Sequence, residues 1–383
     1  MQLSVIILNY NVRYFLELCV LSVQKAIQNL DAEIIIIDNN SSDDSCAMMK
    51  QRFPDIKLIE NKENSGFPKG NNIAVKKAKG EYICILNPDT VVAEDTFEKV
   101  LKFVSSRAHS RDDLGIVGCK LIDGAGNFLP ESKRGIPTPW VAFTKISGLY
   151  KLFPKSSLFN KYYAQHLDKN QTGKVDILVG AFMVMQRELY NEMGGFDENC
   201  FMYADDIDLS YRALQKGKSN YYFAETTVIH YKGESTIRDQ KYMKHFQEAM
   251  QFFYKKHFRK SIIFDWMMQI GSFIFSKIKK NQQHNYIFYP HETVLFTKEL
   301  LTIQNLSPIC NHSKFDMLKI NPAINYQLVF DVQSFSFQEI INFVKQAKSK
   351  NITFKMFLPE SNFIIGSNHA NDKGIIINLA KIE

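Results

Sequence analysis

The chain has 383 residues, of which 45% are hydrophobic and 23% charged, with 18 glycines and 11 prolines. This composition is typical of a folded globular protein with a large core, and it excludes collagen-like, low-complexity and wholly disordered classes. Much of the formal net charge of +7 falls in residues 255–280, where seven basic residues accompany one acid. The rest of the chain is nearly neutral, so we expect no nucleic-acid partner.

Membrane-spanning and secreted classes are also not expected. No apolar stretch reaches the ~18–20 residues that a spanning helix needs. The N-terminus, MQLSVIILNYNVRYF, lacks the basic region and the cleavage site of a signal peptide. The six cysteines are scattered without a CxxC pair, which argues against a disulfide framework or a zinc site. These features predict a cytoplasmic protein.

The first part of the chain alternates strand-like and helix-like segments. Apolar runs predict strands at 3–8, 33–37, 56–59 and 82–86, with helical patterns between them, the last at 71–79. Such alternation predicts an α/β fold with a parallel sheet. Continuous runs such as Ile34–Ile37 suit strands that are covered on both faces.

Polar side chains stand where these predicted strands end. In parallel sheets, ligands bind in a crevice outside the carboxyl ends of the strands. We therefore expect one crevice to be lined by Asn9, Asn11, Asp38, Asn87 and Asp89.

The middle of the chain is less regular between 130 and 176. Residues 177–185 are again strand-like, and the segment GGFDENCFMYADDIDLSYRALQKG reads as a loop that enters a helix. A strand at 221–223 and a strand-like stretch ending at His230 follow. The pattern thus predicts that the first domain continues to about residue 255.

Residues 256–284 form a basic segment with apolar residues at helical spacing, among them Ile263, Trp266 and Ile270. This pattern is typical of a helix that lies on an anionic membrane surface, here through 255–280, and equally of a helix that packs on the preceding domain. The pattern of residues 285–383 predicts a small α/β module, with strands at 326–330, 352–357, 363–365 and 375–378 and a helix at 336–348. The module has no Gly-rich phosphate loop and no catalytic cluster, so no role follows from it.

Two acidic clusters and one histidine are the residues with potential chemistry. Asp89 ends a strand in Asn87-Pro88-Asp89, where it is suited to hold a divalent cation or merely to form a turn. Asp205, Asp206 and Asp208 crowd one loop-to-helix junction, where Asp206 or Asp208 is a candidate helix cap. Neighbouring carboxylates raise the pKa of an acid toward neutral pH, and a carboxylate with such a pKa is suited to be a general base.

The order of these features along the chain resembles the inverting glycosyltransferases of family 2, in the rhamnosyltransferase-like branch from bacterial polysaccharide biosynthesis. The matching stretches are VIILNYN, IIIIDNNSSDDS, ENSGFPKGNNIAVKKAKGEYICILNPDT, VGAFMVMQRE, GGFDENCFMYADDIDLSYRALQKG and VIHYKGEST. They span residues 3 to about 236. The resemblance implies the GT-A fold, a Rossmann-like mixed and mostly parallel sheet flanked by helices, at residues 1–255.

The resemblance also implies roles for particular residues. Those that would bind the nucleotide and the donor sugar are Asn9, Asn11, Asp38, Asn64, Gly70, Asn71, Asn87, Asp89, Gly180 and Ala181, with Gly66 shaping the loop. Asp89 and His230 would hold Mn²⁺ or Mg²⁺, and an imidazole ligand favours Mn²⁺. The first acid of the family's DxD motif is Asn87 here, which leaves less negative charge for the cation.

Asp206 would be the general base and Asp205 would orient the acceptor. The implied reaction moves a sugar from a UDP- or dTDP-linked donor, such as dTDP-rhamnose, to a hydroxyl of a glycan or lipid-linked acceptor in cell-surface polysaccharide synthesis. Arg134 or Lys232 would assist the leaving diphosphate. The enzyme would work in the cytoplasm, with the basic segment at the inner face of the membrane.

Three other interpretations of the sequence compete with a glycosyltransferase function. A dinucleotide-binding oxidoreductase would need a Gly-rich turn after the first strand, where the chain has Asn9-Tyr10-Asn11-Val12. A nucleotidyltransferase would carry a Gly-rich basic loop near the N-terminus, which is absent. A catalytically weak nucleotide-sugar-binding scaffold of a polysaccharide assembly complex remains open, because Asn87 replaces an acid.

Overall fold

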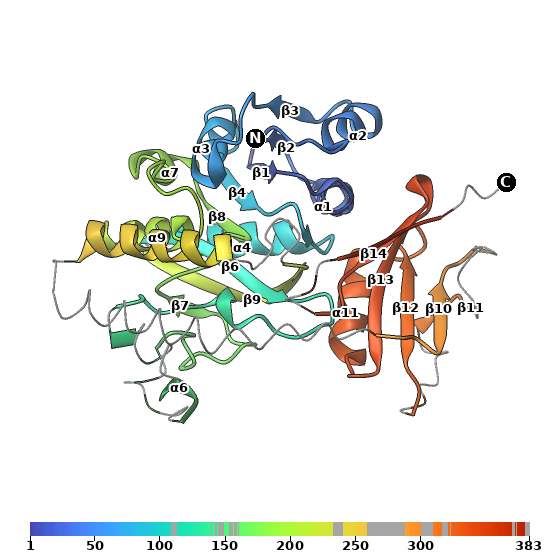
Figure 1. Ribbon diagram of the computed structural model, residues 1–383. Coiled ribbons are helices and arrows are strands. Elements are labelled where there is room, and N and C mark those ends of the chain that lie inside the picture. Colours follow the sequence, from blue (N-terminus) through green and yellow to red (C-terminus); the bar gives the residue numbers. More distant parts are fainter. Residues whose placement is uncertain are drawn as a thin grey trace.

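The computed structural model describes residues 1–108, 113–138, 140–141, 144, 149–152, 156, 159, 161–232, 240–258, 288–299, 309–315, 321, 323–369, 372 and 374–379. Within these residues the chain forms a nine-stranded sheet in its N-terminal domain and a six-stranded sheet in its C-terminal module. The two sheets lie beside each other, with the module at the right of Figure 1.

The larger sheet has the strand order β3-β2-β1-β4-β8-β6-β9-β5, and β7 pairs with β9. Its strands are β1 (Leu3–Asn9), β2 (Ala32–Asp38), β3 (Lys57–Glu60), β4 (Tyr82–Leu86), β5 (Thr90–Val91), β6 (Leu114–Ile122), β7 (Gly173–Val175), β8 (Phe182–Gln186) and β9 (Ser219–His230). The first four strands of that order are parallel, and β8 runs antiparallel to both of its neighbours. This mixed sheet confirms the predicted fold class.

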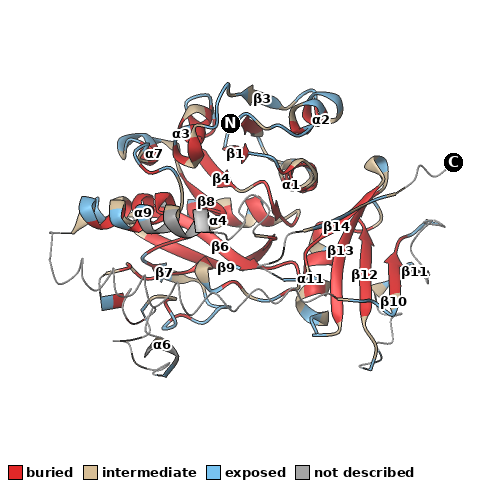
Figure 2. Cartoon of the chain, in the orientation of Figure 1, coloured by how far each residue is buried: buried red, intermediate tan, exposed pale blue. Residues whose placement is uncertain are grey.

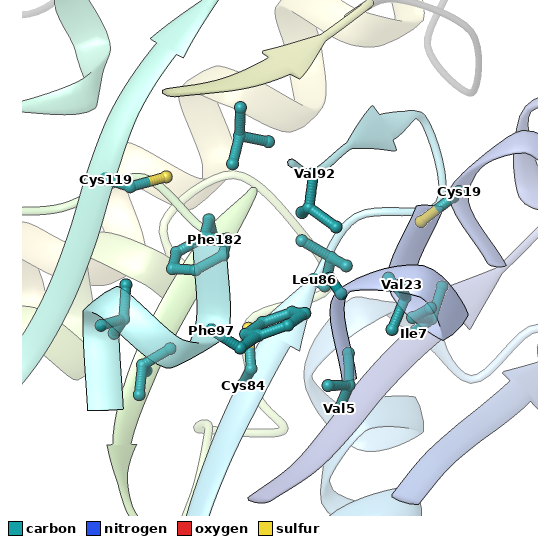
Figure 3. Packing of buried hydrophobic residues seen from close by; sticks show 14 of the residues in the cluster. Val5, Ile7, Cys19, Val23, Cys84, Leu86, Val92, Phe97, Cys119 and Phe182 are labelled. Atoms are coloured by element: carbon teal, nitrogen blue, oxygen red, sulfur yellow. The ribbon is translucent and has the colours of Figure 1, made fainter. Parts of the chain in front are cut away.

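Helices cover both faces of the larger sheet. The helices described in the N-terminal domain are α1 (Arg13–Ile27), α2 (Ser45–Arg52), α3 (Gly66–Val75), α4 (Thr96–Ala108), α6 (Leu149–Leu152), α7 (Arg187–Glu192), α8 (Asp205–Gln215), α9 (Gln240–His257) and the 3₁₀ turn η1 (Pro130–Ser132). On one face α1, α2 and α4 share a core with alternate strand residues such as Val5 and Ile7 (Figure 3). On the other face α3 and α8 pack on residues such as Ile6 and Ile35. The unbroken isoleucine run of β2 therefore has apolar partners on both sides.

Some elements differ from those that the sequence predicted. β6 was not predicted, and the strand predicted at 221–223 and the strand-like stretch ending at His230 form one strand of 12 residues, β9. Helix α3 spans Gly66–Val75, whereas the pattern indicated 71–79. Gly66 and Pro68 obscured its start, although a proline is tolerated in the first turn of a helix.

The C-terminal sheet has the strand order β11-β10-β12-β13-β14-β15. Its strands are β10 (Glu292–Phe296), β11 (Ile309–His312), β12 (Tyr326–Asp331), β13 (Ile352–Leu358), β14 (Phe363–Gly366) and β15 (Ile375–Asn378), accompanied by α11 (Phe337–Ala347) and the 3₁₀ turn η3 (Pro359–Ser361). The predicted helix and four predicted strands of this module are confirmed to within about one residue at each end.

The module and the N-terminal domain share a hydrophobic core. Phe15 and Leu18 of α1, together with Val91, Ile229 and Tyr231, pack in one cluster with the sheet and helix of the module. Figure 2 shows buried residues continuing across this boundary. The carboxylate of Glu94 accepts hydrogen bonds from the backbone N–H groups of Phe337 and Gln338, at 2.8 Å each. Because Ile229 and Tyr231 flank His230, the module supports the strand end that carries this histidine.

We expect Leu18→Ala to lower the free energy of unfolding by about 2–5 kcal/mol, since it removes a fully buried side chain from the shared core. Chemical denaturation of the full chain measures this loss. Leu152→Ala is the matched control, because Leu152 is 71% exposed and should change stability little. Equal stabilities of the two variants would contradict a shared core at Leu18.

The basic segment predicted to bind a membrane or to pack on the core lies largely outside the described residues. Helix α9 ends at His257, and residues 259–287 are not described. Among the helices of the described ranges, none is long and apolar enough to cross a membrane.

Candidate active site

Parallel pairing of β1 with β2 places Asn9 beside Asp38 at the carboxyl end of the sheet. The Asn9 side-chain amide donates to Asp38 Oδ2 at 2.7 Å, and Ser41 Oγ donates to the same oxygen at 2.6 Å. Asn11 has a left-handed φ of 56°, and its Oδ1 accepts from the backbone N–H of Ser42 at 2.7 Å. The three polar residues predicted at these strand ends therefore occupy one corner. Ser41, which joins them, was missed by the sequence reasoning.

The start of α3 forms the next side of this corner. Gly66 has a φ of +79°, and a Cβ there would stand 2.8 Å from the ring of Phe201. Its backbone N–H donates to Asn64 Oδ1 at 3.1 Å. A Cβ at Gly70 would overlap Cδ1 of Leu8, so a larger residue there would require the Leu8 side chain to move. The fully buried Asn71 donates to the carbonyl of Phe67 at 2.9 Å.

A second group forms where β5 pairs with the end of β9. Thr90 lies opposite His230 in this antiparallel pair, which brings His230 to the neighbouring Asp89. His230 Nε2 lies 3.3 Å from Asp89 Oδ1 and 3.4 Å from Asn87 Nδ2. Asp89 and His230, separated by more than 140 positions, are thus brought together as predicted.

These side chains fit a divalent cation. Asp89 and His230 are 5% and 6% exposed, and among the described residues His230 Nδ1 and Asn87 Oδ1 are buried without a hydrogen-bond partner. The described residues contain no group of three or more histidine, cysteine or acidic side chains arranged so that it could hold a metal ion. Two protein ligands would leave most of the coordination shell to other oxygen donors, as is common for hard cations.

Strand β8 connects this group to the acidic helix. Antiparallel pairing sets Leu86 opposite Phe182, and the backbone N–H of Asn87 donates to the carbonyl of Ala181 at 3.1 Å. One residue earlier, the backbone N–H of Gly180 donates to Asp206 Oδ2 at 3.0 Å. The Gly180–Ala181 backbone therefore contacts both Asn87, which begins the segment that carries Asp89, and the predicted base Asp206.

Asp206 forms a buried ion pair with Arg134, whose Nη2 donates to Asp206 Oδ2 at 2.6 Å. Burial alone would lower the pKa of Arg134, but the charge and hydrogen bond of Asp206, together with the nearby Tyr162 and Glu131, raise that pKa. The other oxygen, Asp206 Oδ1, is buried and has no hydrogen-bond partner among the described residues. One oxygen of Asp206 is thus anchored while the other keeps its lone pairs available.

Asp205 has a raised pKa. Burial and the neighbouring charge of Asp206 raise the pKa of Asp205 to about 7. At neutral pH this carboxyl group is thus partly protonated and able to donate a hydrogen bond as well as to accept one.

The same shift predicts how stability depends on pH. An acid whose pKa is higher in the folded than in the unfolded state destabilises the fold above its folded pKa, and this cost disappears as the pH falls toward the unfolded value. We expect Asp205→Asn to raise the melting temperature at pH 8 by several degrees and to have little effect near pH 4. Thermal denaturation at both pH values measures the difference. A stabilisation that is the same at pH 4 and pH 8 would contradict the raised pKa.

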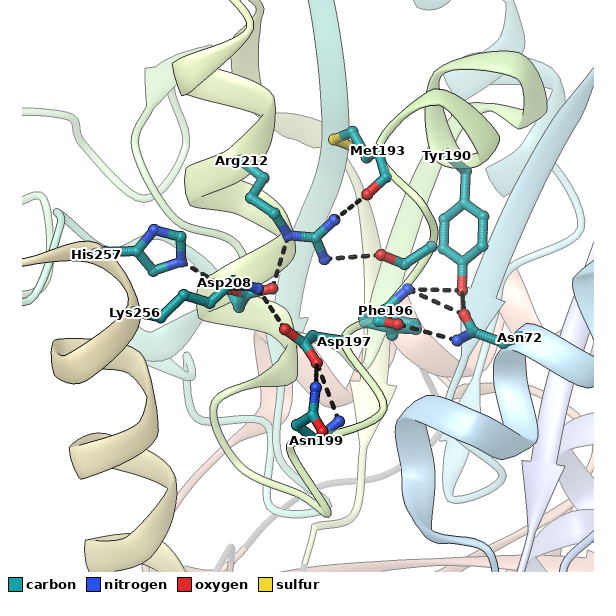
Figure 4. A network of polar contacts seen from close by, with 11 residues as sticks. Asn72, Tyr190, Met193, Phe196, Asp197, Asn199, Asp208, Arg212, Lys256 and His257 are labelled. Atoms are coloured by element: carbon teal, nitrogen blue, oxygen red, sulfur yellow. Dashed lines mark hydrogen bonds and ion pairs between the residues drawn. The ribbon is translucent and has the colours of Figure 1, made fainter.

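Asp208 has a structural environment instead of a catalytic one (Figure 4). Its fully buried carboxylate accepts from Arg212 at 2.7 Å, from His257 at 2.6 Å and from Lys256 at 2.8 Å. Although burial opposes the charge, these donors lower the pKa of Asp208 to about 2. The alternative that Asp206 or Asp208 caps a helix is wrong, because the N-cap is Ala204 and all three acids lie within the first turn of α8.

The two basic residues that were expected to assist the leaving diphosphate each have a carboxylate partner in the structure. Arg134 is committed to Asp206 and to the carbonyl of Leu178, which its Nη2 reaches at 2.8 Å. Lys232 forms an ion pair with Glu131, and although burial opposes the charge of Glu131, Lys232 lowers its pKa. Neither pairing leaves a signal in the sequence, because each joins residues from distant segments.

Residues 4–194, about half of the chain, match the family model "Glycosyl transferase family 2". Among curated proteins, the chain is similar to the N-acetylglucosaminyl-diphospho-decaprenol L-rhamnosyltransferase of Mycobacterium tuberculosis, with 25% identity over 54% of this chain and 68% of the relative. It is also similar to rhamnosyltransferase WbbL of Escherichia coli, with 27% identity over 55% of this chain and 78% of the relative.

Solved structures with a similar fold include GalNAc-T7 with UDP, GalNAc and Mn²⁺, at 17% identity and a TM-score of 0.49 over 76% of this chain and 59% of that chain. The match to the family model and the relatives agree with the resemblance seen in the motifs. The chain is a glycosyltransferase that belongs to family 2.

Proposed function

We propose that this glycosyltransferase transfers a sugar, with inversion, from a UDP- or dTDP-linked donor to a hydroxyl group of a glycan or lipid-linked acceptor. The nucleotide would bind at the corner formed by Asn9, Asp38 and the start of α3. The donor sugar would lie over Gly180 and Ala181, between the Asp89–His230 pair and Asp206.

The observation that carries this proposal is the environment of Asp206. Its Oδ2 is held by Arg134 and by the backbone N–H of Gly180, while the buried Oδ1 has no partner among the described residues. A buried oxygen without a hydrogen-bond donor is costly, and such an oxygen often has a catalytic role or binds a water molecule or an ion. An acceptor hydroxyl that donates to Oδ1 would satisfy this oxygen and be aligned for deprotonation.

In this mechanism the acceptor oxygen attacks the anomeric carbon of the donor from the side of Asp206. Its proton passes to Asp206 Oδ1, the new glycosidic bond forms, and the bond between the anomeric carbon and the diphosphate breaks. Asp205, partly protonated near pH 7, would orient the acceptor by a hydrogen bond. The nucleoside diphosphate leaves as the second product.

Asp89 and His230 would hold Mn²⁺ or Mg²⁺, and the imidazole makes Mn²⁺ the better fit. The cation would supply positive charge to the leaving diphosphate. Asn87, in the position of an acid, would contribute its unpartnered Oδ1 or stay outside the coordination shell.

The printed names of the relatives support a narrower proposal. Both relatives are rhamnosyltransferases, and the name of one includes N-acetylglucosaminyl-diphospho-decaprenol. We therefore propose dTDP-rhamnose as the first donor to test and a lipid-linked glycan of the cell envelope as the acceptor class. Such an acceptor would be met at the inner face of the membrane, where the basic segment 255–280 would bind anionic lipid. Flotation of the full chain with vesicles of anionic and of neutral lipid tests this contact, and no binding to anionic vesicles would contradict it.

The thermal stability of the full chain against UDP, dTDP, GDP and NAD, each with and without Mn²⁺, tests the proposed function. A ligand at 100 times its dissociation constant stabilises a protein by ~2.7 kcal/mol. We expect Mn²⁺-dependent stabilisation by UDP or dTDP, and release of that nucleotide from its sugar conjugate. Binding without turnover would favour the scaffold alternative, and a response to NAD alone would contradict the proposal.

A further inference from the structure

The first turn of α8 is fixed by a contact network that lies outside the site described above (Figure 4). Asp208, which is fully buried, follows Asp206 by two residues. Of its three basic partners, Arg212 lies one turn later on α8, whereas Lys256 and His257 come from the last turn of α9. Without the α9 residues, Asp208 would be paired only within its own helix.

The same network holds the loop between α7 and α8. Arg212 donates to the carbonyls of Met193 and Gly195 at 2.6 and 2.7 Å, and Lys256 also pairs with Asp197 at 2.6 Å. From the opposite side, Asn72 of α3 donates to the carbonyl of Phe196 at 2.9 Å. The loop therefore connects α3, which carries Gly70 and Asn71, to the helix that carries Asp205 and Asp206.

We propose that Lys256 and His257 are positioning residues, which hold α8 through Asp208 so that Asp205 and Asp206 face the Gly180 backbone. This inference rests on the proposed function of Asp206. Neither residue approaches the site directly; each acts through the buried carboxylate of Asp208, two and three residues from the acids that it positions.

The physical basis is the cost of a buried charge. Removing a partner from a buried ion pair leaves an uncompensated charge, and the surrounding structure shifts to bring water or another cation to it. Such a shift would rotate or translate the first turn of α8 relative to Gly180. A displacement of 1 Å in a catalytic group costs up to ~10²-fold in rate.

The test is the double variant Lys256→Met/His257→Gln of the full chain. It should lower kcat by about 10- to 100-fold when kcat is expressed per donor-binding site, counted by titration with UDP or dTDP in the presence of Mn²⁺. The KM for the donor should change less than about twofold, because the contacts of Lys256 and His257 in the described part of the chain are with Asp197, Asp208 and neighbouring aromatic rings. A role in folding alone would lower the number of donor-binding sites and leave kcat per site unchanged.

Two further variants complete the design. Lys256→Arg keeps a cation within reach of Asp208 and should restore most of the kcat that Lys256→Met loses. Lys216→Met is the matched control, because it removes a lysine next to the end of α8 that pairs with Glu192 and not with Asp208. If the double variant does not fold, His257→Gln alone should show a smaller loss of kcat with the same unchanged donor KM.

A wild-type kcat per site in the double variant, or in His257→Gln if the double variant does not fold, would overturn the inference while leaving the proposed function intact. A wild-type chain that binds the nucleotide but transfers no sugar would overturn the proposed function, and the inference with it.

Discussion

Asp206→Asn is expected to lower kcat by ~10²–10⁴-fold, the usual contribution of a general base. Asparagine keeps the size of the side chain and leaves an oxygen for Arg134 and for the backbone N–H of Gly180, so the fold should survive. The amide has no basic oxygen to take the acceptor proton. Initial rates of sugar transfer, with nucleotide binding measured in parallel, separate this loss from a loss of donor affinity.

Asp113→Asn is the matched control for this prediction. Asp113 is 46% exposed in its side chain and pairs with Lys174, away from the site, so its variant should turn over at the wild-type rate. If Asp206→Asn retained near-full turnover, Asp206 would not be the base. Asp205, whose pKa is about 7, would then be the next residue to test.

Asp89→Ala is expected to weaken Mn²⁺-dependent binding of UDP or dTDP by at least ~10-fold, since even indirect partners of metal ligands contribute 10–100-fold to metal affinity. The variant removes one of the two proposed protein ligands and leaves His230 without its acidic neighbour at 3.3 Å. Calorimetric titration of the nucleotide at several Mn²⁺ concentrations measures the effect. His230→Ala should produce a loss of the same kind.

The dependence on metal is what distinguishes this prediction from simple damage to the fold. Nucleotide binding measured with EDTA should be equally weak in the wild type and in Asp89→Ala. Asp113→Asn again serves as the control and should retain the full Mn²⁺ effect. Normal Mn²⁺-dependent binding by either ligand variant would show that the residue is not a metal ligand.

Local patterns were sufficient for much of the parallel half of the sheet. β1, β2 and β4 are apolar runs whose residues have partners on both faces, and β4 has the predicted bounds, Tyr82–Leu86. Because parallel strands end at the same edge, the meeting of Asn9 with Asp38 also follows from the order of the strands. The antiparallel half was harder to predict, since β6 contains Gly115 and Gly118, and β9 contains polar residues and a shift of register.

The C-terminal module illustrates the same limit. Its helix and central strands were readable because α11 and β12 have regular apolar patterns. Its attachment to α1 and to the segment around His230 could not be predicted, because the shared core joins residues from distant segments of the chain. Periodicity reports which face of an element is apolar and does not report which other element covers that face.

The sequence by itself determined the fold class, the family and the polar residues that end each strand, because these depend on short segments and on their order. Only the tertiary structure decided which groups are paired and which are left available. The ion pair of Arg134 with Asp206 and the contacts of Lys256 and His257 with Asp208 arise from long-range packing, so no local pattern encodes them. The chemistry assigned to Asp205 and Asp206 depends on burial and on neighbouring charges, and both are properties of the folded chain.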